Sequence, residues 1–254
     1  MAVAAAMGVD LGSTTTKLVV VDATGALLLK RVEPTAPTMA QQAEAMVRQA
    51  RTELAASAVP LVATGYGRHL VDGASRKVTE ITCHARGVFH ATGQRGTLID
   101  IGGQDTKVIT IGAKGRVLSF AMNDKCAAGT GRFLEVAAQR LQLPLDAFGA
   151  VALEGEVEEP LSSTCVVFAE SEMISLLARG VALAPIVRGL HRSLVRRVSA
   201  LARGAGVQAP VFLSGGVARN PAVRALLEVE LGLPVTVPLH PQVAGAWGAA
   251  LLAL

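Results

Sequence analysis

The hydrophobic and polar positions of this chain form one pattern that is written twice, ninety positions apart. In residues 7–33 and again in residues 97–121, an apolar run reaches an acidic residue and a glycine-rich bend, and further apolar runs follow. Short apolar runs bounded by turn residues are typical of β-strands, so we expect three strands in each copy. Self-similarity at a fixed offset predicts a duplicated structural unit. The matching positions are Asp10 and Asp100, Gly12 and Gly102, Thr16 and Thr106, and Lys17 and Lys107.

The segments outside the two repeats have the periodicity of amphipathic helices or of short buried strands. Thr38 is expected to begin a helix that runs to about Ala56, and Asn220, Pro221 and Gly232 are the residue types that begin and end a helix. Further helices are predicted over residues 83–92, 132–141, 167–179, 185–204 and 243–254, and further strands over residues 61–64, 210–216 and 234–237. Strands that alternate with helices predict an α/β protein.

Length and composition describe a folded chain with room for two domains. The sequence has 254 residues, of which 51% are hydrophobic and 17% charged, so it is too apolar to be disordered. Glycines near residue 94 predict a boundary between a first domain, 1–94, and a second, 95–254, whose closing helix can pack back on the first. No apolar run approaches the ~20 residues of a membrane-spanning helix, and the N-terminus lacks a basic signal segment. We therefore expect a cytoplasmic protein without membrane contact.

The net charge of +4 is a mild basic excess that suits an anionic ligand or an acidic partner. Part of this charge recurs at helical spacing on Arg188, Arg192 and Arg196, and the simplest interpretation is a solvated helix face. Aromatic residues make up 3% of the chain, which leaves few side chains to stack on bases. Nucleic-acid binding is therefore not expected.

The bend of the first repeat has the composition of a phosphate-binding turn. Its residues offer backbone amides, hydroxyls and one ammonium group to phosphate oxygens. An ordinary hairpin turn would explain one such bend, but the second copy places an Asp and a Gly at the same strand end. Because buried carboxylates need partners, Asp10 and Asp100 are expected to hold Mg²⁺, through water. The phosphate-binding candidates of the first copy are Gly12, Ser13, Thr14, Thr15, Thr16 and Lys17.

A third glycine-rich element, residues 213–220, follows a predicted buried strand. Its glycines Gly215 and Gly216 let the backbone come close to a flat ligand such as adenine. The three elements together resemble the phosphate-1, phosphate-2 and adenosine motifs of the superfamily that contains sugar and acetate kinases, Hsp70 and actin. This resemblance implies two ribonuclease-H-like domains with ATP or ADP in the cleft between them. It does not separate a kinase from a chaperone or a motor.

Three cysteines, Cys83, Cys126 and Cys165, carry further candidate chemistry. An odd number in an apparently intracellular chain argues against a disulfide framework. Cys126 and Cys165 each lie at a predicted helix start, where the helix dipole and free amides stabilise a thiolate. The spacing leaves three interpretations open: inert buried thiols, a zinc site, or an iron–sulfur cluster whose four ligands come from a two-fold dimer.

Four segments resemble the activator ATPases of 2-hydroxyacyl-CoA dehydratases and the related ATPase subunits of benzoyl-CoA reductase. These segments are residues 65–68, 100–105, 123–135 and 162–172, and the string Asn-Asp-Lys-Cys-Ala-Ala-Gly-Thr-Gly-Arg-Phe is the most specific. The resemblance implies that Cys126 and Cys165 ligate one [4Fe–4S] cluster shared across a homodimer, while Cys83 stays a core cysteine. Its other implied roles are Ser13 to Lys17, Gly102 and Gly103 for phosphates, Gly215 and Gly216 for adenosine, Gln242 beside the nucleotide, and Gln104 or Asp105 for orienting the attacking water.

The activity that this resemblance implies is ATP hydrolysis that drives the transfer of one low-potential electron. The electron passes to a 2-hydroxyacyl-CoA dehydratase or an aromatic-CoA reductase component, and a ferredoxin or flavodoxin supplies it. Because the second hairpin leads into Cys126, its closure on ATP is expected to act on the cluster. Two alternatives share the fold: a small-molecule kinase, and a nucleotide-switched scaffold without a cluster. Protein purified without oxygen is expected to be brown and to bleach with dithionite if it is the activator ATPase, and to be colourless if it is a kinase or a scaffold.

Overall fold

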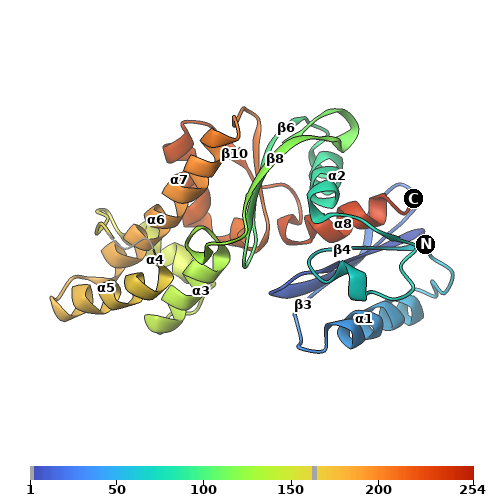
Figure 1. Cartoon of the computed structure of the whole chain (residues 1–254), viewed down its shortest axis with the longest axis horizontal. Helices are drawn as coiled ribbons and strands as arrows, with labels where there is room; N and C mark the ends of the chain where they lie inside the picture. The colour runs from blue at the N-terminus through green and yellow to red at the C-terminus, as the bar shows by residue number, and fades with distance from the viewer. Residues whose placement is uncertain (1–2, 162–164) are drawn as a thin grey trace. The chain divides into compact units, whose positions relative to one another are not determined.

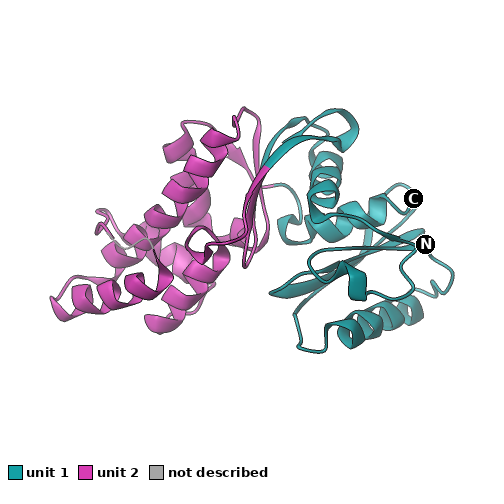
Figure 2. Ribbon diagram, viewed as in Figure 1, with its two compact units in different colours: residues 1–98, 109–120, 238–254 teal, residues 99–108, 121–237 magenta. Residues whose placement is uncertain are grey.

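The computed structural model describes residues 3–161 and 165–254, which form an α/β protein with two five-stranded sheets (Figure 1). Two compact units divide the chain (Figure 2): residues 1–98, 109–120 and 238–254 form unit 1, and residues 99–108 and 121–237 form unit 2. Part of the segment 162–172, namely residues 162–164, lies outside the described residues. The domain boundary expected at residue 94 stays a prediction.

The first sheet belongs to unit 1 and has the strand order β3-β2-β1-β4-β5. Strand β1 pairs antiparallel with β2 and parallel with β4, so the sheet is mixed. All six residues of β1 are buried, because helices cover both faces of the sheet at this strand. The strands are β1 (Ala6–Leu11), β2 (Thr15–Val21), β3 (Leu27–Pro34), β4 (Leu61–Thr64) and β5 (Arg76–Lys77).

Helices α1 (Met39–Glu53) and α8 (Ala244–Leu251) pack on the two faces of this sheet. Met7 and Val9 join the hydrophobic core that includes α1, whereas Ala6 joins the core that includes Trp247 of α8. This division follows from the alternation of side chains along a strand. Gly8 allows α8 to come close, because a Cβ at Gly8 would overlap the backbone of α8. Helix α2 (Glu80–Thr92) packs against α8 in turn.

The second sheet has the order β10-β9-β6-β7-β8. Written from its other side, as β8-β7-β6-β9-β10, it has the same order as the first sheet, with β6 in the place of β1. Strands β6 and β7 are joined by four residues, a connection that allows only antiparallel pairing. Strands β9 and β10 pair parallel, so this sheet is mixed as well. The predicted duplication is confirmed, since the two repeats supply the same three neighbouring strands of each sheet. The strands are β6 (Gly96–Ile101), β7 (Thr106–Ile111), β8 (Val117–Asn123), β9 (Val211–Ser214) and β10 (Val235–Thr236).

The described residues of unit 2 form five α-helices around one core: α3 (Gly131–Arg140), α4 (Phe148–Glu154), α5 (Val166–Ala178), α6 (Leu183–Gly204) and α7 (Pro221–Leu231). The predicted ends of α7 are confirmed: the Asn220 side chain accepts hydrogen bonds from the amides of Ala222 and Val223, and Gly232 is left-handed. Thr38 precedes α1 as predicted, but its side chain makes no capping hydrogen bond. Helix α4 was not predicted, because two turns give too little periodicity to recognise.

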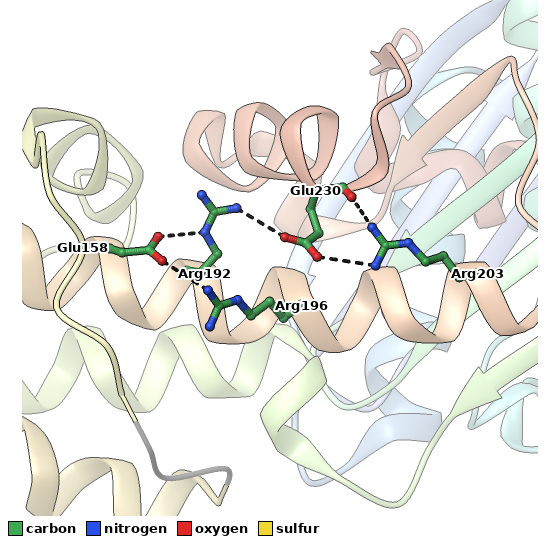
Figure 3. A network of polar contacts seen from close by, with 5 residues as sticks. All are labelled: Glu158, Arg192, Arg196, Arg203 and Glu230. Atoms are coloured by element: carbon green, nitrogen blue, oxygen red, sulfur yellow. Dashed lines mark hydrogen bonds and ion pairs between the residues drawn. The ribbon is translucent and has the colours of Figure 1, made fainter.

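The solvated face expected for the arginines of α6 is found only in part, because Arg196 is exposed whereas Arg192 is mostly buried. Arg192 lies 2.7 Å from Glu158 and 3.5 Å from Glu230, and its side chain is mostly buried (Figure 3). Arg196 also pairs with Glu158, and Arg203 with Glu230. Networks of several charges contribute more than isolated surface pairs do. Three of the five arginines of α6 therefore share two carboxylates within unit 2, and a basic excess remains on the helix.

Across residues 3–161 and 165–254, every helix is too short or too polar to cross a lipid bilayer.

Candidate functional site

The end of strand β1 carries a buried ion pair in unit 1. Asp10 is 4% exposed, and its Oδ2 forms an ion pair with Lys17 Nζ of β2 at 3.1 Å. Residue Gly65, at the end of β4, has a φ of +89°, and a Cβ there would overlap the Asp10 carboxylate. Gly245 of α8 comes close from another side, because a Cβ there would lie 3.2 Å from Asp10 Oδ2. Two glycines therefore leave room for the Asp10 carboxylate.

The bend between β1 and β2 is held from one side by Thr35. The Thr35 hydroxyl donates to the carbonyl of Gly12 at 2.8 Å, and the Thr35 amide donates to the carbonyl of Thr14. Ser13 is exposed, Thr14 and Thr15 are half-buried, and the Lys17 side chain keeps 15% of its exposure. Thr16 is fully buried and its hydroxyl contacts Thr35 and Gln42. Thr16 thus supports the bend through contacts inside unit 1.

The corresponding end of strand β6 carries a larger polar cluster in unit 2. Asp100 is 2% exposed and accepts a hydrogen bond from Ser214 Oγ of β9 at 2.6 Å. Lys107 lies 2.6 Å from Asp105 Oδ1 and 3.9 Å from Asp100 Oδ2. Gly215, with a φ of +88°, places its Cα against this carboxylate, since a Cβ would lie 3.1 Å from Asp100 Oδ1. The contacts join Asp100, Asp105 and Gly215 at one sheet edge.

The remaining nucleotide candidates lie on turns. Gly102 and Gly103 are half-buried, and their carbonyls accept hydrogen bonds from the amides of Gly131 and Arg132 at the start of α3. Gln104 is exposed at the tip of the same turn. The short helix η4 (Gly216–Arg219) begins at Gly216, which is exposed. Gln242 is half-buried in η5 (Pro241–Val243) of unit 1, three residues before Gly245.

The three cysteines differ in their surroundings. Cys126 and Cys165 are exposed, and both belong to unit 2. Cys165 occupies the N-cap position of α5, whereas Cys126 precedes the short helix η3 (Ala127–Gly129) rather than an α-helix. Cys83 is buried in α2, as predicted, and burial raises the pKa of its thiol to about 12. Cys83 is therefore inert, and Cys126 and Cys165 are the accessible thiols.

The chemistry of these two thiols fits half of a four-ligand iron–sulfur site. The part of the chain that the structure describes contains no group of three or more His, Cys, Asp or Glu side chains arranged to hold a metal ion. Two exposed thiols per chain would make four ligands when two copies meet. For Mg²⁺, the oxygens of Asp10 and Asp100 are suitable donors, although each carboxylate already has a lysine within 4 Å. This arrangement fits a hydrated ion better than a direct ligand bond.

Sequence reasoning missed Ser214 as a partner of Asp100. The signal was present, because Ser214-Gly215 at the end of β9 matches Thr64-Gly65 at the end of β4 in residue type and position. It also missed Thr130, whose hydroxyl contacts the carbonyls of Gly103 and Ala127. These two hydroxyls connect elements that the sequence separates by many residues.

Known proteins are similar to this chain over nearly its whole length. The chain is 41% identical over 97% of its length to the 2-hydroxyisocaproyl-CoA dehydratase activator of Clostridioides difficile, covering 94% of that protein. It is 39% identical over 97% of its length to the (R)-2-hydroxyglutaryl-CoA dehydratase activating ATPase of Acidaminococcus fermentans, covering 96% of it.

Solved structures are similar as well. The structure of the activator of the 2-hydroxyisocaproyl-CoA dehydratase from Clostridium difficile with bound ADPNP matches this chain over its whole length, with a TM-score of 0.92 and 40% identity, and the match covers 94% of the activator chain. A Streptomyces griseus glucokinase shares the fold alone, at 19% identity over 97% of this chain and 98% of its own, with a TM-score of 0.59. Residues 7–253 match one ATPase family over nearly the whole chain, so this protein is a member of the BadF/BadG/BcrA/BcrD ATPase family.

Proposed function

We propose that this ATPase activates a 2-hydroxyacyl-CoA dehydratase, or a related aromatic-CoA reductase, by delivering one low-potential electron to it. Relatives of nearly the same length that are named as dehydratase activators support the activator role. The observation that carries the electron-transfer part is the pair of exposed thiols, Cys126 and Cys165, on one unit. A kinase or a nucleotide-switched scaffold has no use for such a pair.

The nucleotide is assigned to the duplicated hairpins and the third glycine element. Lys17 and the bend residues Ser13 to Thr15 hold phosphate oxygens, together with Gly102 and Gly103, while the fully buried Thr16, also predicted to bind phosphate, supports the bend from inside unit 1. Asp10 and Asp100 hold Mg²⁺ through water, and Gln104 or Asp105 orients the water that attacks the terminal phosphate. Gly215 and Gly216 accommodate the adenosine, and Gln242 lies beside the nucleotide. Backbone amides in a bend and a nearby ammonium are the groups that bind phosphate in proteins.

Cys126 and Cys165 are assigned to one [4Fe–4S] cluster per homodimer, which carries a single electron between a ferredoxin or flavodoxin and the enzyme that is activated. Each chain supplies two thiolates, and exposure of both thiols makes them available to a second copy. The described residues of one chain offer no third or fourth cysteine near them, so the ligand set depends on dimerisation.

The cluster assignment is tested by iron content after reconstitution without oxygen. Cys126→Ser and Cys165→Ser are each expected to lose the iron, the sulfide and the visible absorption that dithionite bleaches. Cys83→Ala is the matched control, because Cys83 is buried in α2 and is expected to leave iron content unchanged. Iron that persists in both serine variants, or its absence from the wild type, would contradict the assignment. The partner is then sought by crosslinking under reducing conditions with ATP.

A further inference from the structure

The glycine turn of the second hairpin is hydrogen-bonded to the segment that follows Cys126. The amide of Gly131 donates to the carbonyl of Gly102 at 2.8 Å, and the amide of Arg132 donates to the carbonyl of Gly103 at 2.9 Å. The buried Thr106 hydroxyl of β7 donates to the carbonyl of Gly129 at 2.6 Å. Turn and segment therefore lie against each other within unit 2, although more than twenty residues separate them in the chain.

Cys126 is tied to the same segment by its backbone. Its amide donates to Asn123 Oδ1 at 3.2 Å, and Asn123 Nδ2 donates to its carbonyl at 2.9 Å. The next residue, Ala127, begins η3, and the amide of Thr130 donates to the carbonyl of Ala127 at 3.0 Å. A change in the η3 turn would therefore move the backbone on which the Cys126 thiol stands.

The Thr130 hydroxyl lies between these two regions and has two acceptors for one proton. Thr130 is fully buried, and its Oγ1 lies 3.1 Å from the carbonyl oxygen of Gly103 and 2.8 Å from that of Ala127. A hydroxyl donates one hydrogen bond, so it serves one of the two carbonyls fully at any moment. Each carbonyl keeps one backbone donor in either case, from Arg132 or from Thr130 itself. The hydroxyl proton is thus the contact that the two turns share.

We propose that Thr130 is the positioning residue that couples the nucleotide state of the Gly102–Gly103 turn to the position of Cys126. When phosphate binding changes the arrangement of the turn, the Gly103 carbonyl reorients. The hydrogen bond that the Thr130 hydroxyl donates then changes its acceptor between the Gly103 and the Ala127 carbonyl. The two arrangements differ by the partner of one hydrogen bond, which makes them close in free energy and sensitive to a ligand. This inference rests on the proposed function for the use of Cys126, but it is measured without the cluster.

The test is the rate at which iodoacetamide alkylates Cys126 in the iron-free full-length chain, followed by mass spectrometry. Saturating ADP and a non-hydrolysable ATP analogue are expected to give rates that differ about fivefold, the range that one hydrogen bond of ordinary strength supports. Thr130→Val, which keeps the side-chain shape and removes the hydroxyl, is expected to abolish this difference, and Thr130→Ser to restore it. Thr92→Val is the control, because Thr92 donates to a carbonyl of its own helix α2 in unit 1.

Two results would overturn the coupling. One is a wild-type alkylation rate that is the same with both nucleotides, and the other is a Thr130→Val variant that binds nucleotide and keeps the wild-type difference. Should Thr130→Val fail to fold, hydrogen exchange of residues 123–132 in the wild type replaces it. Equal exchange with ADP and with the analogue would then refute the proposal. A wild-type protein that binds no iron would refute the proposed function, but the alkylation rate of Cys126 could still differ between the two nucleotides. The failure of the proposed function and the failure of the coupling are therefore distinguishable.

Discussion

The two copies of the hairpin share a backbone and an Asp–Lys pair, yet their lysines have different surroundings. Lys17 lies 3.1 Å from one carboxylate, Asp10, and its side chain keeps 15% of its exposure. Lys107 lies within 4 Å of two carboxylates, Asp100 and Asp105, and keeps 3%. The position equivalent to Asp105 in the first copy is Thr15. One residue therefore decides whether the ammonium of the repeat is available to an anion or is used to hold carboxylates.

The hydroxyl residues that end β4 and β9, Thr64 and Ser214, also have different surroundings. Ser214 donates to Asp100, so β9 is tied to the second hairpin through a buried polar contact. Its equivalent, Thr64, lies beside the Cys83 thiol, whose pKa is raised by burial and lowered by that hydroxyl. Polar contacts in the second copy thus run from the turn to the third glycine element. We infer that the first copy supplies binding charge and the second copy supplies positioning.

The largest expected effect is on stability, from Lys107→Met. Removing the cation leaves Asp100 buried without its compensating charge, and breaking a buried ion pair costs about 3–5 kcal/mol of unfolding free energy. Urea unfolding without nucleotide measures this loss. The double variant Lys107→Met/Asp100→Asn is expected to recover much of it, because the uncompensated charge is gone. A Lys107→Met variant as stable as the wild type would contradict the role of Lys107 in holding the carboxylates of the second copy.

Acid is expected to destabilise unit 2 through His191, a fully buried residue of α6 whose ring packs against Phe148. Burial lowers the pKa of His191 from 6.5 to about 4, and the ring contacts the Val187 carbonyl and Asn220. The unfolded chain then takes up the proton first as the pH falls, so stability is full above pH 6.5 and decreases toward pH 4. The loss is about 3 kcal/mol at its limit. Urea unfolding between pH 7 and pH 4 measures it, and His191→Gln is expected to flatten that part of the profile.

Lys17→Met is expected to act mainly on the nucleotide. A hydrogen bond from an ammonium to a charged acceptor contributes about 1.5–3 kcal/mol, so the affinity for ATP should fall about ten- to a hundredfold. Stability should fall less than in Lys107→Met, since one carboxylate rather than two loses its cation. Calorimetric titration with an ATP analogue measures the affinity. Equal losses of affinity in both lysine variants would show that the two lysines have the same role.

These differences mark the limit of sequence reasoning on this chain. The strand pattern and the ends of α7 were readable because each depends on residues near one another in the chain, and the repeat was readable because its two copies have the same residue types at a fixed offset. Asp105 and Lys107 are two residues apart on an extended backbone and therefore share a face, so their pairing was also within reach. The contact of Ser214 with Asp100 spans 114 residues, and only the folded sheet brings the two side chains together. The place of Thr130 between two turns depends on the fold in the same way.

The smallest expected effect is on the unfolding free energy, from removing the hydroxyl of Ser214 or that of Thr64. Ser214→Ala removes a 2.6 Å hydrogen bond to a buried carboxylate and should cost about 1.5 kcal/mol, the lower end for a charged acceptor. Thr64→Val removes a hydroxyl beside a neutral thiol while keeping the side-chain shape, and should cost about 0.5 kcal/mol or less. Urea unfolding of both variants under one condition measures the contrast. Equal losses would mean that Thr64 supports Asp10 as Ser214 supports Asp100, and the contrast between the two copies would then rest on position 105 and its equivalent.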